Sequence, residues 1–341
     1  MLSHGAILII TDLFLGRNEA KVLIDTWLIC VFSFIALVLV CCIAITLYCF
    51  FKVFYSPKRK PLLPDEYSFP VGEIYDKYHD QMVRWTKQVR ELPHVDMEIK
   101  SFDGLTLKGK YYEYKPGAVI EILFHGYKGD SERDMCGAVE RCFLMGRNAL
   151  LVDQRAAGRS DGHVISFGIN ERLDCVSWAK YVAEKFGEDQ KIVITGISMG
   201  ASTVLMAAAD PELPKNVISV LADCGYSSAE LIIKKVIAEL HLSPRIFYPF
   251  VRLAGLIFGG FDLNSFSPIE AIEKINIPIV FVHGTNDDFV PFEMSKSMFD
   301  KFSGQKILIA IDGAGHGLAY PANKEEYLSQ VKTFIKQNNL A

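Results

Sequence analysis

A serine between a predicted strand and a predicted helix is the residue of this sequence best suited to nucleophilic chemistry. Ser198 is the centre of a G-x-S-x-G pentapeptide at residues 196–200. The apolar run 191–195 predicts a strand, and the run 201–209 predicts a helix. The sharp turn between them lifts the hydroxyl clear of the sheet, and glycines are needed where strand and helix crowd together. We expect Ser198 to be a nucleophile, and the alternative is an ordinary turn serine.

A hydroxyl is a weak nucleophile, so it needs a general base, and the base needs an acid to orient it. Two predicted strands, 279–282 and 306–311, are each followed by a polar loop. The first loop contains Asp287 and the second contains His316. The chain order serine, acid, histidine is one of those known for this chemistry. We therefore assign His316 as general base and acid, and Asp287 as the residue that orients it.

An oxyanion formed by attack of Ser198 needs backbone N–H donors. One donor should be the N–H of Met199, directly after the nucleophile. The second should come from an upstream loop between a strand and a helix. Residues 118–124 predict that strand and residues 125–129 its loop, in which we expect the N–H of Tyr127 to complete the oxyanion hole.

These motifs together resemble the α/β-hydrolase superfamily of serine hydrolases. The resemblance covers roughly Val95 to the C-terminus. Within the superfamily, the motifs resemble those of the monoglyceride-lipase-like and serine-aminopeptidase-like branch. It implies the α/β-hydrolase fold and a catalytic triad, and the spacing of the acid to Val290-Pro291 favours Asp287 over Asp288. Asp288 is expected instead to cap the helix that begins near Pro291. The matching segments are His125-Gly126, 153–162, 196–200, 283–291 and 315–317.

Other polar residues near these motifs have a structural explanation beside the functional one. His125 and His283 each precede a glycine at the end of a predicted strand, and we expect both to shape loops through hydrogen bonds rather than to react. No metal site or cofactor is expected, because the remaining histidines have no partner at metal-ligand spacing. These are His4, His79, His94, His163 and His241.

Two arginines in the 153–162 segment are candidates for binding an acidic substrate. The more ordinary role for Arg155 and Arg159 is an internal ion pair, for which Glu171 and Asp174 on the following predicted helix are candidate partners. The sequence leaves substrate contact open as the alternative.

Composition limits the possible partners. The chain has 341 residues, of which 50% are hydrophobic, and a net charge of −4. It has no basic stripe with interleaved aromatic residues, so nucleic acid is not an expected partner. The eight cysteines lack the spacing of a disulfide framework, which favours a reducing compartment. The sequence does not indicate an oligomeric state.

An uncharged segment at residues 27–51 follows an N-terminal segment, 1–26. As a helix its 25 residues would span about 37 Å, more than the ~30 Å hydrocarbon core of a bilayer. A cleaved signal peptide is the alternative, but the run is too long for one and residues 51–54 do not form a small-residue cleavage site. The sequence thus predicts a single-pass protein of the cell membrane that contacts membrane lipid.

Charges on the two sides of this span predict its orientation. Arg17 and Lys21 precede it, and four cations follow it. Because cations are enriched on the cytoplasmic side, the following domain is expected in the cytoplasm. The four cations are Lys52, Lys58, Arg59 and Lys60.

A linker with one helix should separate the span from the catalytic domain. We place this juxtamembrane part at residues 52–93, with a helix over 72–91 that packs on the domain or lies at the membrane surface. The catalytic domain is placed at 94–341.

The predicted architecture is α/β: a mostly parallel sheet of eight strands with flanking helices. A hairpin of 95–101 and 105–114 should precede six parallel strands. The insertion 226–275 is too long for a simple crossover and predicts a small helical lid. Its apolar side chains either only pack the lid on the domain, or some of them line an acyl pocket or touch lipid. The parallel strands are expected near Val119, Ala149, Ile192, Val217, Ile279 and Ile307.

The residues favour a membrane-anchored serine hydrolase that cleaves carboxylic ester or thioester bonds of a small-molecule or lipid-like acyl substrate through an acyl-enzyme. A serine peptidase or amidase would use the same triad. A non-catalytic binding protein on the same scaffold is a third possibility, against which the complete set of triad residues argues.

Overall fold

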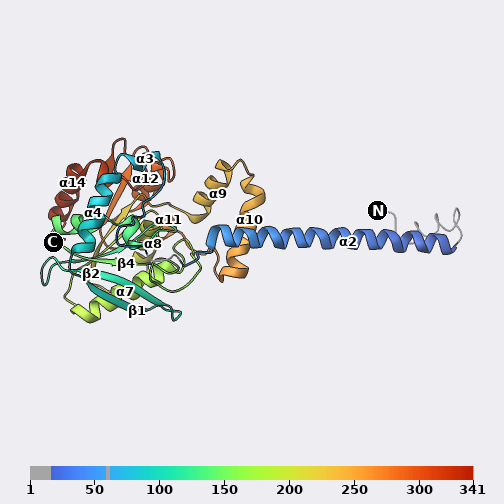
Figure 1. Ribbon diagram of the computed structural model, residues 1–341, viewed down its shortest axis with the longest axis horizontal. Helices are drawn as coiled ribbons and strands as arrows, with labels where there is room; N and C mark the ends of the chain where they lie inside the picture. The colour runs from blue at the N-terminus through green and yellow to red at the C-terminus, as the bar shows by residue number, and fades with distance from the viewer. Residues whose placement is uncertain (1–16, 59–61, 341) are drawn as a thin grey trace. The chain divides into compact units, whose positions relative to one another are not determined.

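The computed structural model describes residues 17–58 and 62–340, which form two compact units, Met1–Cys49 and Phe50–Ala341 (Figure 1). Most of the predicted N-terminal segment, up to residue 16, lies outside the described residues, as do the two cations Arg59 and Lys60.

Helix α2, Arg17–Cys49, makes up the described part of the first unit. Its apolar side chains are exposed, as at Trp27, Phe32 and Leu37. The apolar helical stretch runs over Lys21–Phe54, and a helix of this length and composition fits either a membrane span or a signal sequence. Its last turn, η1 at Phe50–Phe54, is a π-helix and belongs to the second unit.

The second unit contains an eight-stranded sheet, as predicted, and its strand order is β1-β2-β4-β3-β5-β6-β7-β8. Strand β2 is antiparallel to both β1 and β4, and the remaining pairs are parallel. The strands are β1 Val95–Lys100, β2 Thr106–Tyr112, β3 Ile120–Phe124, β4 Asn148–Val152, β5 Ile192–Ile197, β6 Val217–Asp223, β7 Ile279–Gly284 and β8 Lys306–Ile311.

Helices cover both faces of this sheet (Figure 1). Because neighbouring strand residues point to opposite faces, Ile122 packs in one core cluster and Leu123 in another. One face is covered by α7 Glu171–Phe186, α8 Met199–Ala208 and α12 Phe292–Lys301. The other is covered by α4 His79–Glu91, α6 Ala138–Leu144 and α14 Lys324–Gln337. Shorter elements are α3 Glu73–Asp76, α5 Ser131–Asp134, α11 Pro268–Ala271, η3 Ile272–Lys274 and α13 Ala319–Ala322.

The helix predicted over 72–91 is present as α3 and α4, with a break at residues 77 and 78, and it packs on the sheet. Three apolar side chains of α4, Met82, Trp85 and Val89, are at most 6% exposed. A Cβ atom at Gly137 would lie only 2.9 Å from the Trp85 ring, so the glycine makes room for the indole. The compact unit therefore begins at Phe50, and the boundary predicted at residue 94 cuts through it.

The insertion predicted as a lid forms α9 Ala229–Glu239, α10 Pro244–Ala254 and the π-helix η2 Gly255–Gly259, at one side of the sheet (Figure 1). Its aromatic residues pack on η1. The ring centroids of Phe50 and Phe258 are 5.5 Å apart, and those of Phe54 and Phe261 are 5.2 Å apart.

Two truncations test whether α4 belongs to the folded unit. Deleting residues 1–49 should leave a protein that unfolds cooperatively in urea. Deleting residues 1–93 should abolish or strongly weaken that transition, because each buried α4 side chain contributes about 1.5–3 kcal/mol against a total stability of about 5–15 kcal/mol. Equal midpoints for the two proteins would show that α4 is dispensable.

Candidate active site

The turn between β5 and α8 holds Ser198 in a strained backbone conformation, with φ +55° and ψ −119°. Its flanking glycines are required by space. A Cβ atom at Gly196 would lie 2.1 Å from the Gly200 carbonyl, and one at Gly200 would lie 2.0 Å from the Phe124 carbonyl oxygen. The turn is fixed further by the Ser198 N–H, which donates to the Asp223 carbonyl at 2.8 Å. Strain of this kind at a buried polar residue is typical of functional sites.

The loops after β7 and β8 bring an acid and a histidine to this serine. His316 Nε2 lies 2.9 Å from Ser198 Oγ, and His316 Nδ1 lies 2.7 Å from Asp287 Oδ2. The two loops are joined by backbone bonds, as from the Asn286 N–H to the Ala314 carbonyl at 3.0 Å. The structure thus brings Ser198, His316 and Asp287 into one hydrogen-bonded chain.

Asp287 is held as an anion. Burial would raise the pKa of its carboxyl group, but hydrogen bonds from His283 and His316 lower it to about 2. Its other oxygen, Oδ1, accepts the N–H groups of Phe289 at 3.0 Å and Val290 at 2.8 Å. A permanent negative charge at this position favours the Nδ1–H tautomer of His316, which leaves Nε2 free to accept a proton from the serine.

His283 contacts the carboxylate of Asp287, as expected for a structural histidine. It is completely buried. Its Nε2 lies 3.1 Å from Asp287 Oδ2 and 2.9 Å from the Val290 carbonyl, and its Nδ1 lies 2.7 Å from Ser295 Oγ. Both neighbours of Nε2 are acceptors, so this nitrogen carries the proton.

His125 shapes the loop that follows β3. Its Nδ1 lies 2.8 Å from the Gly126 carbonyl, and its Nε2 accepts the Gln154 N–H at 3.0 Å. The Gly126 N–H donates to buried Asp134 Oδ2 at 3.0 Å. Burial raises the pKa of this carboxyl group.

The two residues assigned to the oxyanion hole both adjoin the nucleophile. Met199 is the first residue of α8, where a backbone N–H has no acceptor within the helix. Tyr127 lines the cavity around Ser198, and its hydroxyl donates to the Val53 carbonyl at 2.6 Å. The tyrosine side chain thereby fixes the loop that carries its own N–H.

The capping role predicted for Asp288 is wrong. The N-cap residue of helix α12 is Pro291, whose side chain accepts no hydrogen bond, and Asp288 is exposed three residues earlier. Its backbone carbonyl instead accepts Lys235 Nζ of α9 at 2.6 Å.

The internal ion pair predicted for Arg155 is present, whereas Arg159 pairs with a residue that was not predicted. Arg155 bonds Asp174 through two nitrogens, at 2.6 and 2.8 Å, and also contacts Asp103 at 2.9 Å. Arg159 donates to Asp96 at 2.6 Å. Glu171, the other predicted partner, accepts the backbone N–H groups of Ser166 and Gly168 instead.

A cavity of about 210 Å³ adjoins Ser198 and His316. Part of its wall comes from the segment that precedes β1, through Pro70, Tyr75, Met82 and Trp85. The Tyr75 hydroxyl donates to the His316 carbonyl at 3.0 Å. The helical spacing of these aromatic residues was visible in the sequence, but nothing in it indicated that they cover the catalytic loop.

The insertion 226–275 forms helices, as predicted for a lid, but it does not contribute to this cavity. Among the described residues, none that lines the cavity belongs to it. The physical reason is that its aromatic side chains pack on η1, as Phe258 does on Phe50 and Phe261 on Phe54. Asp223 and Arg141 also line the cavity and were not singled out by the sequence.

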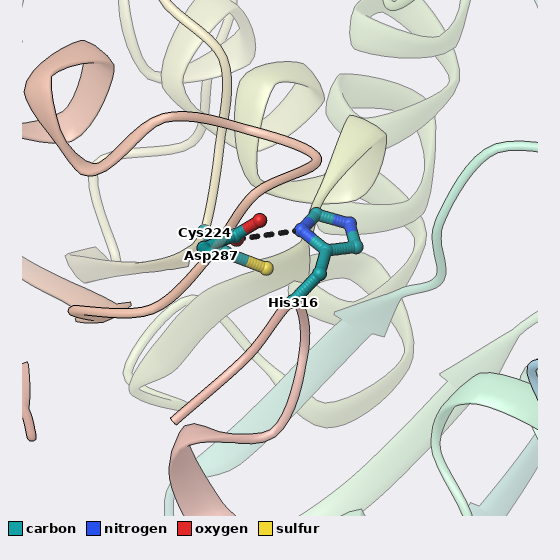
Figure 2. Close-up of side chains that lie close together, drawn as sticks. All are labelled: Cys224, Asp287 and His316. Carbon is teal, nitrogen blue, oxygen red and sulfur yellow. Dashed lines mark hydrogen bonds and ion pairs between the residues drawn. The ribbon is translucent and has the colours of Figure 1, made fainter. Parts of the chain in front are cut away.

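Cys224 lies against the acid and the histidine (Figure 2). One ligand atom each of Cys224, Asp287 and His316 fall within 4.8 Å of one another, close enough to share a metal ion. Their chemistry fits one poorly. Asp287 and His316 are bonded to each other, and burial together with the charges of Asp223 and Asp287 raises the pKa of the Cys224 thiol well above its usual value. A thiol that stays protonated is a poor metal ligand.

Comparison with known proteins points to the same fold. The model of the prolyl oligopeptidase family matches residues 260–340, which include Asp287 and His316. The curated "Uncharacterized protein YqkD" of Bacillus subtilis (strain 168) is 28% identical over 196 residues, which cover 57% of this chain. The match spans 64% of that relative, less than two thirds of its length.

Solved structures share the fold at low sequence identity. The esterase Pf2001 of Pyrococcus furiosus has a TM-score of 0.59 and 23% identity, over 80% of this chain and 97% of its own. The α/β hydrolase GrgF from Penicillium sp. sh18 has a TM-score of 0.56 and 19% identity, over 72% of this chain and 99% of its own. The chain has the α/β-hydrolase fold.

The lowered pKa of Asp287 predicts how the free energy of unfolding changes at acid pH. Because about 2 is below the unfolded value of 3.8, the carboxylate stabilises the native state above pH 4, and this contribution is lost as the pH falls toward 2. In the protein lacking residues 1–49, the difference in free energy of unfolding between wild type and Asp287→Asn should shrink by about 1 kcal/mol from pH 6 to pH 3.

Asp288→Asn serves as the control, because this neighbouring carboxylate is exposed. Its difference from wild type should change little over the same range. A difference for Asp287→Asn that is constant or grows toward pH 3 would contradict the assigned charge state.

Proposed function

We propose that this protein is a serine hydrolase that cleaves carboxylic ester or thioester bonds of acyl substrates through a covalent intermediate on Ser198. The observation that carries the proposal is the hydrogen-bonded chain from Ser198 Oγ through His316 to Asp287. The esterase name of the Pyrococcus furiosus structure supports the same reaction class.

In the first half of the reaction, Ser198 Oγ attacks the acyl carbon while His316 Nε2 takes the hydroxyl proton. Asp287 accepts the Nδ1–H bond and stabilises the imidazolium that forms. The N–H groups of Met199 and Tyr127 would hold the oxyanion. The bond to the leaving alcohol or thiol then breaks as His316 returns the proton to it.

In the second half, water replaces the leaving group. His316 Nε2 takes a proton from the water, whose oxygen bonds to the acyl carbon, and the bond to Ser198 Oγ breaks as the proton passes back to the serine. The free acid leaves, and the starting enzyme is restored.

The cavity favours a small acyl group. Its volume of about 210 Å³ lies below the ~300–1,000 Å³ of pockets that enclose drug-sized ligands. Apolar side chains such as Met82 and Trp85 form part of the wall. A long lipid chain would extend beyond the cavity.

A peptidase or amidase remains the second candidate, since the matched family model is that of the prolyl oligopeptidases. The same triad serves both reactions. A panel of p-nitrophenyl esters of rising chain length, run beside aminoacyl and peptidyl anilides, separates the two.

Ser198→Ala should abolish turnover of whichever substrate the wild type accepts, since removal of a triad nucleophile costs on the order of 10⁶ in kcat. A fluorophosphonate probe should add one adduct to the wild-type mass and none to the variant. Ser265→Ala, at an exposed serine outside the cavity, should behave as wild type. An unlabelled wild type without turnover would favour a binding protein.

We further propose that the apolar stretch Lys21–Phe54 is a membrane span and that the second unit lies on the cytoplasmic side. The cations Lys52 and Lys58 at its C-terminal end support that orientation. A second surface supports contact with lipid. The end of the span, η1, packs on η2, whose neighbouring side chains Leu253, Leu256, Ile257 and Phe258 are 40–60% exposed.

The full-length protein should stay in the membrane pellet after washing with 1 M salt and with carbonate. Screening at 1 M limits electrostatic binding to about 3 Å, so retention would require insertion. Deleting residues 1–49 should release the protein from the pellet, and any remaining binding to vesicles should occur through η2. Ile257→Asp should weaken this remaining binding. Val95→Asp, at another exposed apolar residue, should not weaken it. Release of the full-length protein by either wash would reject the span.

A further inference from the structure

Two neighbouring backbone carbonyls of η1 accept hydrogen bonds from the loop that follows β3. The Val53 carbonyl accepts the Tyr127 hydroxyl at 2.6 Å, and the Lys52 carbonyl accepts Lys128 Nζ at 2.8 Å. Carbonyls in the last turn of a helix lack an N–H partner within the helix, so their partners come from outside. The negative end of a helix dipole also favours the lysine cation. These two bonds join the end of the apolar stretch Lys21–Phe54 to the loop assigned to the oxyanion hole.

The turn that carries both donors is strained. It is closed by the Gly129 N–H, which donates to the Gly126 carbonyl at 3.2 Å. Lys128 has a φ of +51°, in the left-handed region that residues other than glycine rarely adopt. Such a conformation persists only where surrounding contacts hold it. One contact comes from Arg133, which donates to the Lys128 carbonyl at 3.1 Å, and the two bonds to η1 are added by the side chains of the turn itself.

The end of η1 is packed firmly enough to support this turn. Phe54 is completely buried, and its ring centroid lies 6.0 Å from that of Phe167 and 5.2 Å from that of Phe261. The Phe54 carbonyl accepts the Ile165 N–H at 2.9 Å. The Phe167 ring centroid lies 5.0 Å from that of Tyr127. The end of η1 and the side chain of Tyr127 therefore belong to one packed cluster of the second unit.

We propose that η1 is a positioning element of the active site, whose Lys52 and Val53 carbonyls hold the Tyr127 N–H where the oxyanion forms. The inference rests on the proposed function of Ser198. Because the hydroxyl and the N–H belong to one residue, loss of the bond to Val53 frees the donor to move. A donor of an oxyanion hole is effective only when it is in place before the charge develops.

The apolar stretch is long enough to serve as a span and as this support. As an α-helix, its 34 residues would extend about 51 Å, against ~30 Å of hydrocarbon in a bilayer. Its last turn is therefore not needed to cross the membrane. The rate of the reaction then depends on the end of the same helix that anchors the protein.

The test measures kcat of full-length variants in detergent, on the p-nitrophenyl ester that the wild type cleaves fastest. Tyr127→Phe removes the hydroxyl and keeps the ring and the backbone N–H. Its kcat and kcat/KM should fall together by about tenfold, the upper end of what one hydrogen bond contributes. An equal fall in both marks an interaction made in the transition state. Lys128→Met should lower kcat about threefold, and Lys128→Arg, which keeps a cationic donor, should restore most of it.

Tyr226→Phe is the matched control. The Tyr226 hydroxyl donates to the Phe167 carbonyl at 2.9 Å, so the same group is lost from a similar bond that involves neither η1 nor the loop after β3. The control should keep kcat within twofold of wild type, even where its melting temperature falls as far as that of Tyr127→Phe.

A trifluoromethyl ketone with the acyl chain of that ester probes the oxyanion hole without turnover. Ser198 Oγ bonds to the ketone carbon, the hydroxyl proton moves to His316, and the carbonyl oxygen becomes the oxyanion. The inhibition constant should rise in Tyr127→Phe by the factor by which kcat falls, and it should stay at the wild-type value in Tyr226→Phe.

A wild-type kcat and inhibition constant in Tyr127→Phe would overturn the role of η1 and leave the proposed triad chemistry intact. Equal losses in Tyr127→Phe and Tyr226→Phe would overturn it too, because they would reflect the stability of the fold. If Tyr127→Phe fails to fold, Lys128→Met and Lys128→Arg decide, since the Lys128 side chain is only half-buried. A wild type that turns over no ester or anilide and is not inhibited by the ketone would reject the proposed function and the inference with it.

Discussion

The close approach of α8 to the ends of β3 and β5 is the constraint on which the site depends. It leaves no space for a side chain at Gly196 or Gly200, and it forces Ser198 into a backbone conformation that few residues adopt. Both the exposure of the hydroxyl toward His316 and the free N–H groups at the start of α8 follow from this contact. Packing of the central strands therefore provides the rigidity that the turn needs.

Two buried carboxylates, Asp287 and Asp223, lie close to the catalytic histidine and the serine turn. Asp287 has two histidines and two backbone N–H groups, and its pKa falls to about 2. Asp223 lies nearby with a pKa raised to about 6, because burial dominates and its Oδ1 has no partner.

Much of the architecture was predictable from local patterns. The apolar runs at 118–124 and 279–282 and the glycine-flanked Ser198 each carry their own signal, so the strands, the turn and the residues that meet there follow from the sequence. The position of α4 does not. Its apolar spacing predicts a helix, but only tertiary packing shows that Trp85 lies on Gly137 and that Tyr75 bonds the His316 carbonyl. The contact of the insertion 226–275 with η1 could not be predicted for the same reason, because an apolar helix face does not indicate which surface it packs on.

The claim at the centre of this account is that Asp287, rather than the adjacent Asp288, orients His316. The most direct measurement is kcat of Asp287→Asn and Asp288→Asn on the ester that the wild type cleaves fastest. The account predicts a loss of about 10⁴ for Asp287→Asn, because an amide stabilises the wrong imidazole tautomer. It predicts a loss of less than tenfold for Asp288→Asn, whose side chain is exposed. Equal losses, or a larger loss for Asp288→Asn, would contradict it.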